Sequence, residues 1–465
     1  MIGNRIDTND TIAAIASGMG GAIGIVRLSG SRAIEIADSV FKGANGQTLS
    51  SFPTHTIHYG KIIDGDKTID EVLMLLMKAP ATYTREDVVE IDCHGGAYVT
   101  RCVLETLIKA GARPAEAGEF TKRAFLNGRI DLGQAEAVVD IINSKNKHAL
   151  AGALNVLDGK LSMILKKIRA EILEKVAYIE SALDDPEHFS LDNYVDNLEK
   201  DVDKWKNSVD KLVKTGKSGK LFTEGVKTVI LGRPNAGKSS ILNYMSGHER
   251  AIVTEIAGTT RDILEEQIIV GGIMLNLIDT AGIHDTEDVI ETIGVERAKA
   301  AIDEADLILY VVDSSAPLTD DDRLIAELIE NKKYIVLLNK SDLTSLTNEG
   351  DIRSLLASDG ATIISMSAKD MTGLEELSDA IVAMFTDGTI EYNDEMYIAD
   401  ERKMYALRQA EESLDLVLEG CHNKMSEEFL TIDLMSAYAS LGSILGEEVS
   451  EDLLNEIFSK FCMGK

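Results

Sequence analysis

Residues 226–240 read VKTVILGRPNAGKSS, an apolar run followed by a glycine-rich turn that ends in Lys and Ser. The pattern GxxxxGKS, placed after a strand and before a helix, is typical of a phosphate-binding loop. Its glycines let backbone N–H groups surround phosphate oxygens, Lys238 adds a positive charge, and the Ser239 hydroxyl is a ligand for Mg²⁺. The stretch therefore predicts a nucleotide-binding domain.

The sequence downstream of this loop alternates apolar runs with helical segments between residues 222 and 386. The apolar runs are 226–231, 275–278, 307–312, 334–338 and 362–365. Strands that are apolar along nearly their whole length suit a parallel sheet covered by helices on both faces. We therefore expect an α/β fold for this part of the chain.

Three further segments follow these strands in the order expected of a guanine-nucleotide site. Asp279-Thr280-Ala281-Gly282 supplies a carboxylate toward Mg²⁺ and an N–H toward the γ-phosphate. In Asn339-Lys340-Ser341-Asp342, the last carboxylate can accept both N–H groups of the guanine edge, which adenine lacks. Ser367-Ala368-Lys369 is expected to brace the base. We predict GTP, not ATP, as the nucleotide.

The segment 254–262, TEIAGTTRD, is the remaining expected switch, with Thr260 as the second hydroxyl on Mg²⁺; the alternative is a helix cap or a turn. The predicted GTP-binding residues are Asn235, Ala236, Gly237, Lys238, Ser239, Ser240, Thr254, Glu255, Ile256, Ala257, Gly258, Thr259, Thr260, Asp279, Thr280, Ala281, Gly282, Asn339, Lys340, Asp342, Ser367, Ala368 and Lys369.

The group that activates water for hydrolysis is not evident from these motifs. Ras-type proteins carry a Gln after the DxxG glycine, but this chain has Ile283, which cannot orient water. His284 follows, and Glu291 is the best acidic candidate, although its acidic surroundings also suit a helix N-terminus. In place of an arginine finger, a monovalent cation could be held by Asn235 and by carbonyls of residues 254–259.

Length and composition fit a multidomain protein of the cytoplasm. A chain of 465 residues is too long for one core. The four cysteines Cys93, Cys102, Cys421 and Cys462 form no CxxC pair, which favours a reducing compartment over disulfides or a zinc ribbon. Because no apolar run has the length of a membrane span and the first residues have no secretory pattern, we expect no membrane partner.

The formal net charge of −31 limits how nucleic acid can bind. Such a charge repels a phosphate backbone at long range, so a nucleic acid would have to meet a local basic patch or be held by another protein. The acidity also has a simpler interpretation as a means of staying in solution.

The regions that flank the nucleotide domain differ from each other. Residues 1–128 carry strand-like runs and one helix, at about 98–110, and predict an α+β domain. Apolar residues then recur every three or four positions from Leu150 to Ile179, which predicts one long amphipathic helix ended by Asp184-Asp185-Pro186. Another helix is expected around Trp205.

Helical character returns after the nucleotide domain, at about 395–465. We therefore predict a multidomain fold with an α+β domain at 1–128, a discontinuous α-helical domain at 129–221 and 387–465, and an inserted α/β P-loop G domain at 222–386. A Gly- and Lys-rich joint at 214–220 is expected where the insert begins.

Over nearly its whole length the chain resembles the MnmE (TrmE) family of tRNA-uridine modification GTPases. P-loops are common, so the likeness depends on segments outside the G domain together with the inserted arrangement. The matching segments are GRPNAGKSS at 232–240, IAGTTRD at 256–262, DTAG at 279–282, GEF at 118–120, RAFLNG at 123–128, DL at 131–132, QAEA at 134–137 and FCMGK at 461–465.

The resemblance implies a folate-binding N-terminal domain that forms a homodimer and binds a tetrahydrofolate derivative, the 5,10-methylene or 5-formyl form. The matching positions are Arg27, Glu90, Arg129 and Lys465, with Arg129 standing where the family usually has Lys. Cys462 matches a family cysteine that lies near the folate and matters for modification; a buried thiol at a helix end is the alternative.

The resemblance also implies that GTP-bound G domains pair face to face with K⁺ as the activating ion. The K⁺ positions map to Asn235, Thr254, Ile256 and Thr259, and the catalytic carboxylate maps to Glu291. His284 replaces a usual Arg. Mg²⁺ is expected at Ser239 and Thr260.

The implied partner is an MnmG-type protein, which alone carries FAD, in a heterotetramer. The complex would add an aminomethyl or carboxymethylaminomethyl group at carbon 5 of the wobble uridine of certain tRNAs. The other interpretation is a GTP-gated assembly or scaffold switch, for instance in ribosome maturation, without modification chemistry. The folate positions and the C-terminal Lys465 favour the enzyme.

Overall fold

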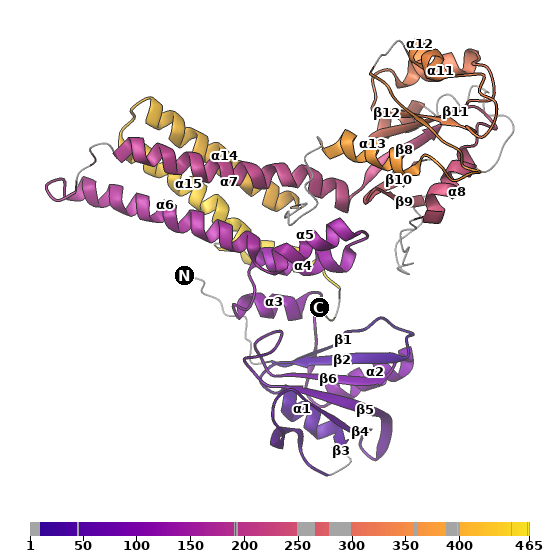
Figure 1. Cartoon of the computed structure of the whole chain (residues 1–465). Coiled ribbons are helices and arrows are strands. Elements are labelled where there is room, and N and C mark those ends of the chain that lie inside the picture. The colour runs from indigo at the N-terminus through magenta and orange to yellow at the C-terminus, as the bar shows by residue number, and fades with distance from the viewer. Residues whose placement is uncertain are drawn as a thin grey trace. The chain divides into compact units, whose positions relative to one another are not determined.

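The computed structural model describes residues 10–43, 46–189, 191, 194–248, 266–278, 299–356, 360–386, 398, 400–447, 449–462 and 464 (Figure 1). The chain divides into two compact units. The first unit contains Met1–Val139, Ser162–Arg169 and Ala439–Lys465, and the second contains Asp140–Leu161 and Ala170–Tyr438. Within the described ranges, no helix combines the length and the apolar character that crossing a membrane requires.

The first unit is built on a seven-stranded sheet with the order β3-β4-β5-β6-β2-β1-β7. Its pairs are antiparallel except for β1 with β7. The strands are β1 (Ile12–Ile15), β2 (Ile23–Ser29), β3 (Phe41–Gly43), β4 (Thr56–Asp64), β5 (Lys67–Met77), β6 (Val88–His94) and β7 (Arg113–Pro114). The three strands expected in the N-terminal part are therefore confirmed as β2, β5 and β6.

One face of this sheet is covered by α1 (Ala33–Val40) and α2 (Ala97–Lys109), which confirms the expected helix. Alternate strand residues such as Val26 and Met74 pack with helix residues such as Ile36 and Val103 in one buried cluster. Because side chains alternate along a strand, the intervening residues, including Arg27 and Glu90, lie on the opposite face.

The end of the chain packs with the helices that follow the sheet. α3 (Glu119–Leu126), α4 (Leu132–Asn143) and α16 (Glu451–Ser459) share a cluster that contains Leu132, Phe458 and Phe461. Gly118 has a φ of +67°, and a Cβ at this position would collide with the Phe461 side chain. The quoted GEF and FC segments are therefore in contact, although more than 300 residues separate them in the sequence.

The second unit contains α5 (Lys147–Leu157), most of α6 (Lys160–Asp184), α7 (Tyr194–Thr223), α14 (Glu401–His422) and part of α15 (Glu427–Leu445). The helix expected around Trp205 is confirmed as α7, and Trp205 is 1% exposed. α6 ends at Asp184, as the Asp-Asp-Pro sequence predicted.

The single long helix predicted from Leu150 to Ile179 is wrong, because the chain breaks between α5 and α6. Gly159 adopts a φ of +84°, a left-handed conformation that an α-helix cannot continue through. In α5 the small residues Gly152 and Ala153 are buried, whereas Leu150 and Leu154 are exposed. The spacing of apolar residues therefore continues from α5 into α6, although in α5 the face that these residues mark is not the buried one.

The Gly- and Lys-rich segment 214–220 is helical, so the expected joint at that place is wrong. A Cβ at Gly216 would collide with the Met404 side chain of α14, so this glycine allows two helices to approach closely. The helix ends at Thr223, and the next residues turn at Gly225, with a φ of +80°, into the next strand. The boundaries 128/129, 221/222 and 386/387 remain predictions.

The inserted α/β part has a six-stranded sheet with the order β13-β12-β11-β8-β10-β9, parallel except for β9 with β10. Its strands are β8 (Val226–Leu231), β9 (Glu266–Val270), β10 (Ile273–Leu277), β11 (Leu307–Asp313), β12 (Tyr334–Asn339) and β13 (Thr362–Ser365). The helices are α8 (Lys238–His248), α11 (Asp320–Ile329), α12 (Glu349–Leu356) and α13 (Leu374–Thr386).

Both faces of this parallel sheet are buried, as the apolar runs predicted. Ile230 and Leu309 pack in a cluster with α8 and α13 residues, and Val229 and Ile308 pack in a second cluster with α11 and α12 residues. Because β8, β12 and β13 run parallel in this sheet, their carboxyl ends lie along one edge, and the quoted motifs follow them there.

Candidate functional site

The loop between β8 and α8 has the backbone geometry of a phosphate-binding loop. Gly232, Asn235 and Gly237 have φ values of +152°, +63° and +97°. A Cβ at Gly232 would collide with the carbonyl oxygen of Val311, and one at Gly237 would collide with the side chain of Asn339. Glycine is therefore required at both positions by φ and by the neighbouring strands β11 and β12.

Lys238 begins α8 and curls back over this loop. Its Nζ donates to the carbonyl oxygens of Gly232 and Arg233, at 2.8 and 2.9 Å. Burial lowers the pKa of Lys238, because the charged form loses contact with water. The ammonium group is thus held inside the ring of the loop, where a phosphate oxygen can meet it, and Ser239 and Ser240 follow in the first turn of α8.

Asn339, the last residue of β12, joins the loop to the segment after β13. Its Nδ2 donates to the carbonyl oxygen of Ala236 at 2.9 Å, and its Oδ1 accepts from the Ala368 N–H at 3.3 Å. The residue is only 2% exposed. Three motifs predicted from separate parts of the sequence therefore meet at this one side chain.

Asp342 and Ser367 form the neighbouring pair at the same edge of the sheet. The Ser367 hydroxyl donates to the Asp342 carboxylate at 2.9 Å, and the Lys369 Nζ lies 3.6 Å from its other oxygen. The bond from Ser367, assisted by Lys369, lowers the pKa of Asp342. The carboxylate is therefore ionised at neutral pH and can accept two N–H groups.

The Lys340 side chain has a different partner from that of Asp342. Its φ is +62°, and its Nζ forms an ion pair with Asp313 at 2.6 Å. Asp313 ends β11 and also accepts from the N–H and the hydroxyl of Ser315. The contact fixes Lys340 beside the loop that follows β11.

Sequence reasoning missed a buried contact that holds the phosphate loop from the other side. Arg233 Nε lies 3.2 Å from Asp322, which is 1% exposed, and its Nη1 donates to the Thr319 hydroxyl. Tyr310 also donates to Asp322, at 2.9 Å. The run Thr319-Asp320-Asp321-Asp322 is a helix-capping sequence, and this was the only sequence signal for the contact.

Several predicted residues lie outside the described part of the chain, and their roles stay predictions. They are Thr254, Glu255, Ile256, Ala257, Gly258, Thr259, Thr260, Asp279, Thr280, Ala281, Gly282, His284, Glu291 and Lys465. Among the residues that are described, no three His, Cys, Asp or Glu side chains gather as a metal site. Of the expected ion ligands, only Ser239 and Asn235 are described, both on the phosphate loop.

Two of the four predicted folate positions, Arg27 and Glu90, lie on the sheet face opposite α1 and α2. Arg27 on β2 and Glu90 on β6 are directly paired in the sheet register, and their side chains form an ion pair at 2.6 Å. Arg27 Nη1 also donates to the carbonyl oxygen of Gly464 at 3.1 Å. Gly464 has a φ of +87° and lies against Ile15. The residue next to Lys465 is thus fixed beside this pair.

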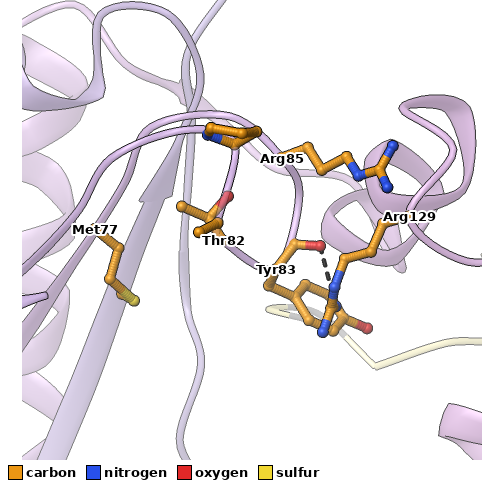
Figure 2. A pocket seen from close by; sticks show the side chains of 7 residues that line it. Met77, Thr82, Tyr83, Arg85 and Arg129 are labelled. Atoms are coloured by element: carbon orange, nitrogen blue, oxygen red, sulfur yellow. Dashed lines mark hydrogen bonds between the residues drawn. The ribbon is translucent and has the colours of Figure 1, made fainter. Parts of the chain in front are cut away.

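Aromatic rings contact both Arg27 and Arg129, and Figure 2 shows the second of these contacts, Arg129 beside the Tyr83 ring. The Arg27 guanidinium lies 5.6 Å from the Phe120 ring centre, and Tyr83 packs in the same cluster as Phe120. Arg129 lies 4.6 Å from the Tyr83 ring centre, and its Nη1 donates to the Tyr83 carbonyl oxygen. Sequence reasoning did not single out Tyr83, and it quoted Phe120 only as part of a motif.

Buried charges hold the loop that carries Tyr83. Arg123, with 4% of its side chain exposed, pairs with Asp10, Glu86 and Glu119. The Thr84 hydroxyl lies 2.6 Å from that of Ser29. The loop is therefore attached at Thr84 and at Glu86 to the rigid part of the unit.

Cys462 follows α16 and has an exposed, free thiol, so the alternative of a buried thiol at a helix end is wrong. Its carbonyl oxygen accepts from the Gly118 N–H at 3.4 Å. Cys93 and Cys421 are buried, and burial raises the pKa of the Cys421 thiol to about 11. Of these three cysteines, only Cys462 is exposed, and it lies two positions before Gly464, which contacts Arg27.

Comparison with family models gives two matches that together span most of the chain. Residues 11–129 match the model of the GTP-binding protein TrmE N-terminus. Residues 132–462 match that of the MnmE helical domain.

Curated relatives match over their whole length. A tRNA modification GTPase MnmE of Lachnoclostridium phytofermentans is 52% identical, with 98% of this chain and 99% of the relative covered. That of Bacillus subtilis is 45% identical, with 98% of this chain and 100% of the relative covered.

Among solved structures, the G domain of the T. maritima FeoB iron transporter is 28% identical over 34% of this chain and 96% of its own, with a TM-score of 0.26. The family models and the full-length relatives agree with the folds of the two sheets and of the helices. The chain belongs to the MnmE family of tRNA modification GTPases, and it is a GTP hydrolase with a TrmE-type N-terminal domain, a helical domain and a G domain.

Proposed function

We propose that this protein couples GTP hydrolysis to the addition of an aminomethyl or carboxymethylaminomethyl group at carbon 5 of the wobble uridine of certain tRNAs. It would act in the cytoplasm with an FAD-carrying MnmG-type partner and with a tetrahydrofolate derivative as the one-carbon source. The observation that carries the proposal is the seating of the C-terminal Gly464 on the Arg27–Glu90 pair. That contact brings the residue next to Lys465 to two of the four expected folate residues, in a protein that also has the nucleotide loop.

At the nucleotide site, the described residues suit a triphosphate and a guanine ring. The Lys238 ammonium and the N–H groups at the start of α8 would bind phosphate oxygens, and the Ser239 hydroxyl is a hard oxygen donor of the kind Mg²⁺ prefers. Asp342 would accept the two guanine N–H groups, with Ser367 holding it in position. We propose the second Mg²⁺ hydroxyl at Thr260, from its sequence motif, and the catalytic carboxylate at Glu291, by family resemblance.

A K⁺ ion is proposed at the same loop, where it would supply the positive charge that other GTPases take from an arginine. Asn235 is exposed on this loop, with a φ of +63°, and its side chain carries an oxygen that could bind the ion. Thr254, Ile256 and Thr259 would complete the site by resemblance. Oxygen donors alone suit a hard cation of this kind.

The proposed folate site has groups that could bind a folate at both of its ends, the Arg27–Glu90 pair and Arg129. Glu90 can accept N–H groups of a pterin ring, and Arg27 holds the Glu90 carboxylate in position through their ion pair. The half-buried Tyr83 ring contacts Arg129 and can offer an aromatic edge to the ligand, whereas the fully buried Phe120 ring supports Arg27. Bound tetrahydrofolate would supply the one-carbon unit, and the exposed Cys462 thiol is proposed to lie beside it.

A homodimer is proposed through the open face of the seven-stranded sheet. Ile23, Ile57, Tyr59 and Leu73 are exposed there, between 43% and 62% of each side chain. Tyr59 pairs with Leu73 across β4 and β5, and this row continues to the strand that carries Glu90. A second copy would cover these apolar groups next to the folate site.

The Asp342→Asn variant should bind GTP about 30- to 1000-fold more weakly, because an amide cannot accept both guanine N–H groups. Fluorescent GTP titration measures the loss. Asp320→Asn, with 94% of its side chain exposed in the wild type, is the matched control and should bind normally. Equal GTP affinity in the Asp342→Asn protein would contradict the role of Asp342.

The same site predicts a pH dependence. Because the pKa of Asp342 is lowered, wild-type binding should persist through mildly acidic pH and disappear only as pH falls through that lowered value. Ser367→Ala removes the main cause of the lowering, so its loss of affinity should begin at a higher pH. If GTP affinity depends on pH in the same way in the wild type and in Ser367→Ala, Ser367 does not lower the pKa of the Asp342 carboxylate.

GTP turnover should be about tenfold or more faster in KCl than in NaCl of equal ionic strength, because the bound ion stabilises charge on the phosphates. Asn235→Ala should lose this difference, whereas Asp320→Asn should keep it. Equal wild-type rates in the two salts would eliminate the K⁺ proposal.

Wobble uridines should be unmodified in a strain that lacks this protein, as measured by mass spectrometry of tRNA nucleosides. Wild-type protein should restore the modification, whereas Arg27→Gln should not, because it removes the contacts with Glu90 and Gly464. GTP turnover of Arg27→Gln should stay normal. Fully modified uridines in the deletion strain would defeat the proposal and favour a GTP-gated assembly switch.

The Leu73→Glu variant should be monomeric in sedimentation velocity, because a buried carboxylate would be unpaired in the dimer. Thr68→Glu, an exposed position on the same strand, makes the same charge change and should stay dimeric. Both variants should bind GTP normally, which shows that they fold. A dimeric Leu73→Glu protein would place the interface elsewhere.

A further inference from the structure

A cavity of about 480 Å³ lies beside Arg129 in the first unit. It is lined by Met77, Pro80, Ala81, Thr82, Tyr83, Arg85 and Arg129 (Figure 2). Among these described lining residues there are two guanidinium groups and no carboxylate. In a chain with a net charge of −31, this is a local reversal of sign, and it favours an anionic ligand.

Arg85 is held in one place by its backbone and by α3. Its φ is +60°, and its Nη1 donates to the Asn127 carbonyl oxygen at 3.0 Å. The Asn127 side chain donates in turn to the Thr84 carbonyl oxygen at 2.7 Å. A guanidinium has five N–H donors, so this bond leaves a fork that can meet a carboxylate.

The loop around Arg85 is anchored on both sides, by Thr84 to Ser29 and by Glu86 to the buried Arg123. Its guanidinium is therefore presented by a rigid support, and less conformational entropy is lost when a ligand binds. Figure 2 shows Arg129 lying against the Tyr83 ring while Arg85 extends from the same loop.

The cavity shares Arg129 with the proposed folate site. Arg129 lines it together with Tyr83 and Arg85, and Tyr83 packs against the cluster of the buried Phe120, whose ring Arg27 contacts. A molecule with a ring at one end and acidic groups at the other matches the carboxylate acceptor of the folate site, this aromatic edge and these guanidinium groups.

We propose that this cavity binds the glutamate tail of the folate, with Arg129 on the first glutamate and Arg85 on the carboxylates of glutamates added beyond it. The inference rests on the proposed folate function and adds a preference for the polyglutamate form. Arginine suits this role because its planar fork pairs with a carboxylate through two parallel hydrogen bonds.

The test compares the affinity of the full-length protein for 5-formyl-tetrahydrofolate carrying one or three glutamates, by calorimetric titration. Wild-type protein should bind the triglutamate about tenfold more tightly, as expected of one charge-assisted pair. Arg85→Met should reduce this ratio to about one and leave monoglutamate binding nearly unchanged. Arg85→Lys should keep an intermediate ratio, since it keeps the charge and loses the fork.

Arg32→Met is the matched control, because Arg32 is exposed, pairs with Glu35 and does not line the cavity. It makes the same charge change and should retain the wild-type ratio. Normal GTP binding by each variant checks that the chain is folded.

Two outcomes would overturn the inference while leaving the folate function intact. In one, the wild type binds both forms equally; in the other, Arg85→Met keeps the full triglutamate preference. If wild-type protein binds neither form, the proposed folate function fails as well. The two failures are therefore distinguishable.

Discussion

The hydrogen bond from Arg27 to the Gly464 carbonyl oxygen joins positions 437 residues apart, and the architecture of the first unit depends on it. α16 packs with α3, Gly464 lies against Ile15 of β1, and Arg27 contacts both the Gly464 carbonyl oxygen and Glu90. This contact can form only after the chain between Arg27 and Gly464 has been synthesised. The helices and the α/β part are therefore an insertion between two halves of one site.

The nucleotide site is constrained in a different way, by backbone. Gly232 and Gly237 lie so close to β11 and β12 that no side chain fits, and Asn339 bonds to both neighbouring segments. Arg233 secures the same loop to the cap of α11 through the buried Asp322. Each contact joins segments that follow different strands, so the parallel sheet is what brings them to one edge.

Electrostatics acts locally in this protein, against a strongly negative whole. Arg123 is almost completely buried, and three carboxylates compensate its charge. Arg85 and Arg129 line a cavity in which none of the described residues is acidic. The first arrangement holds the Tyr83 loop, and the second is the proposed glutamate site. Net charge alone would have suggested neither.

Much of the fold could be predicted from local patterns, because apolar periodicity and glycine-rich loops are properties of short segments. Three strands of the first sheet, five strands of the second, α2, α7 and the nucleotide motifs at 232–239, 339–342 and 367–369 are of this kind. The break at Gly159 was missed because the apolar period ran on through it, and the helical course of 214–220 was missed because Gly216 serves helix packing and not flexibility.

The residues Arg27, Glu90 and Arg129 were assigned through family resemblance, since no local pattern marks them. Tyr83, Arg85, Asp322 and the seat of Gly464 were found only in the tertiary structure. Each of these acts through partners remote in sequence, and such contacts are set by how strands and helices pack. The sequence by itself thus determined which chemistry the chain carries, and the tertiary structure decided which side chains meet to perform it.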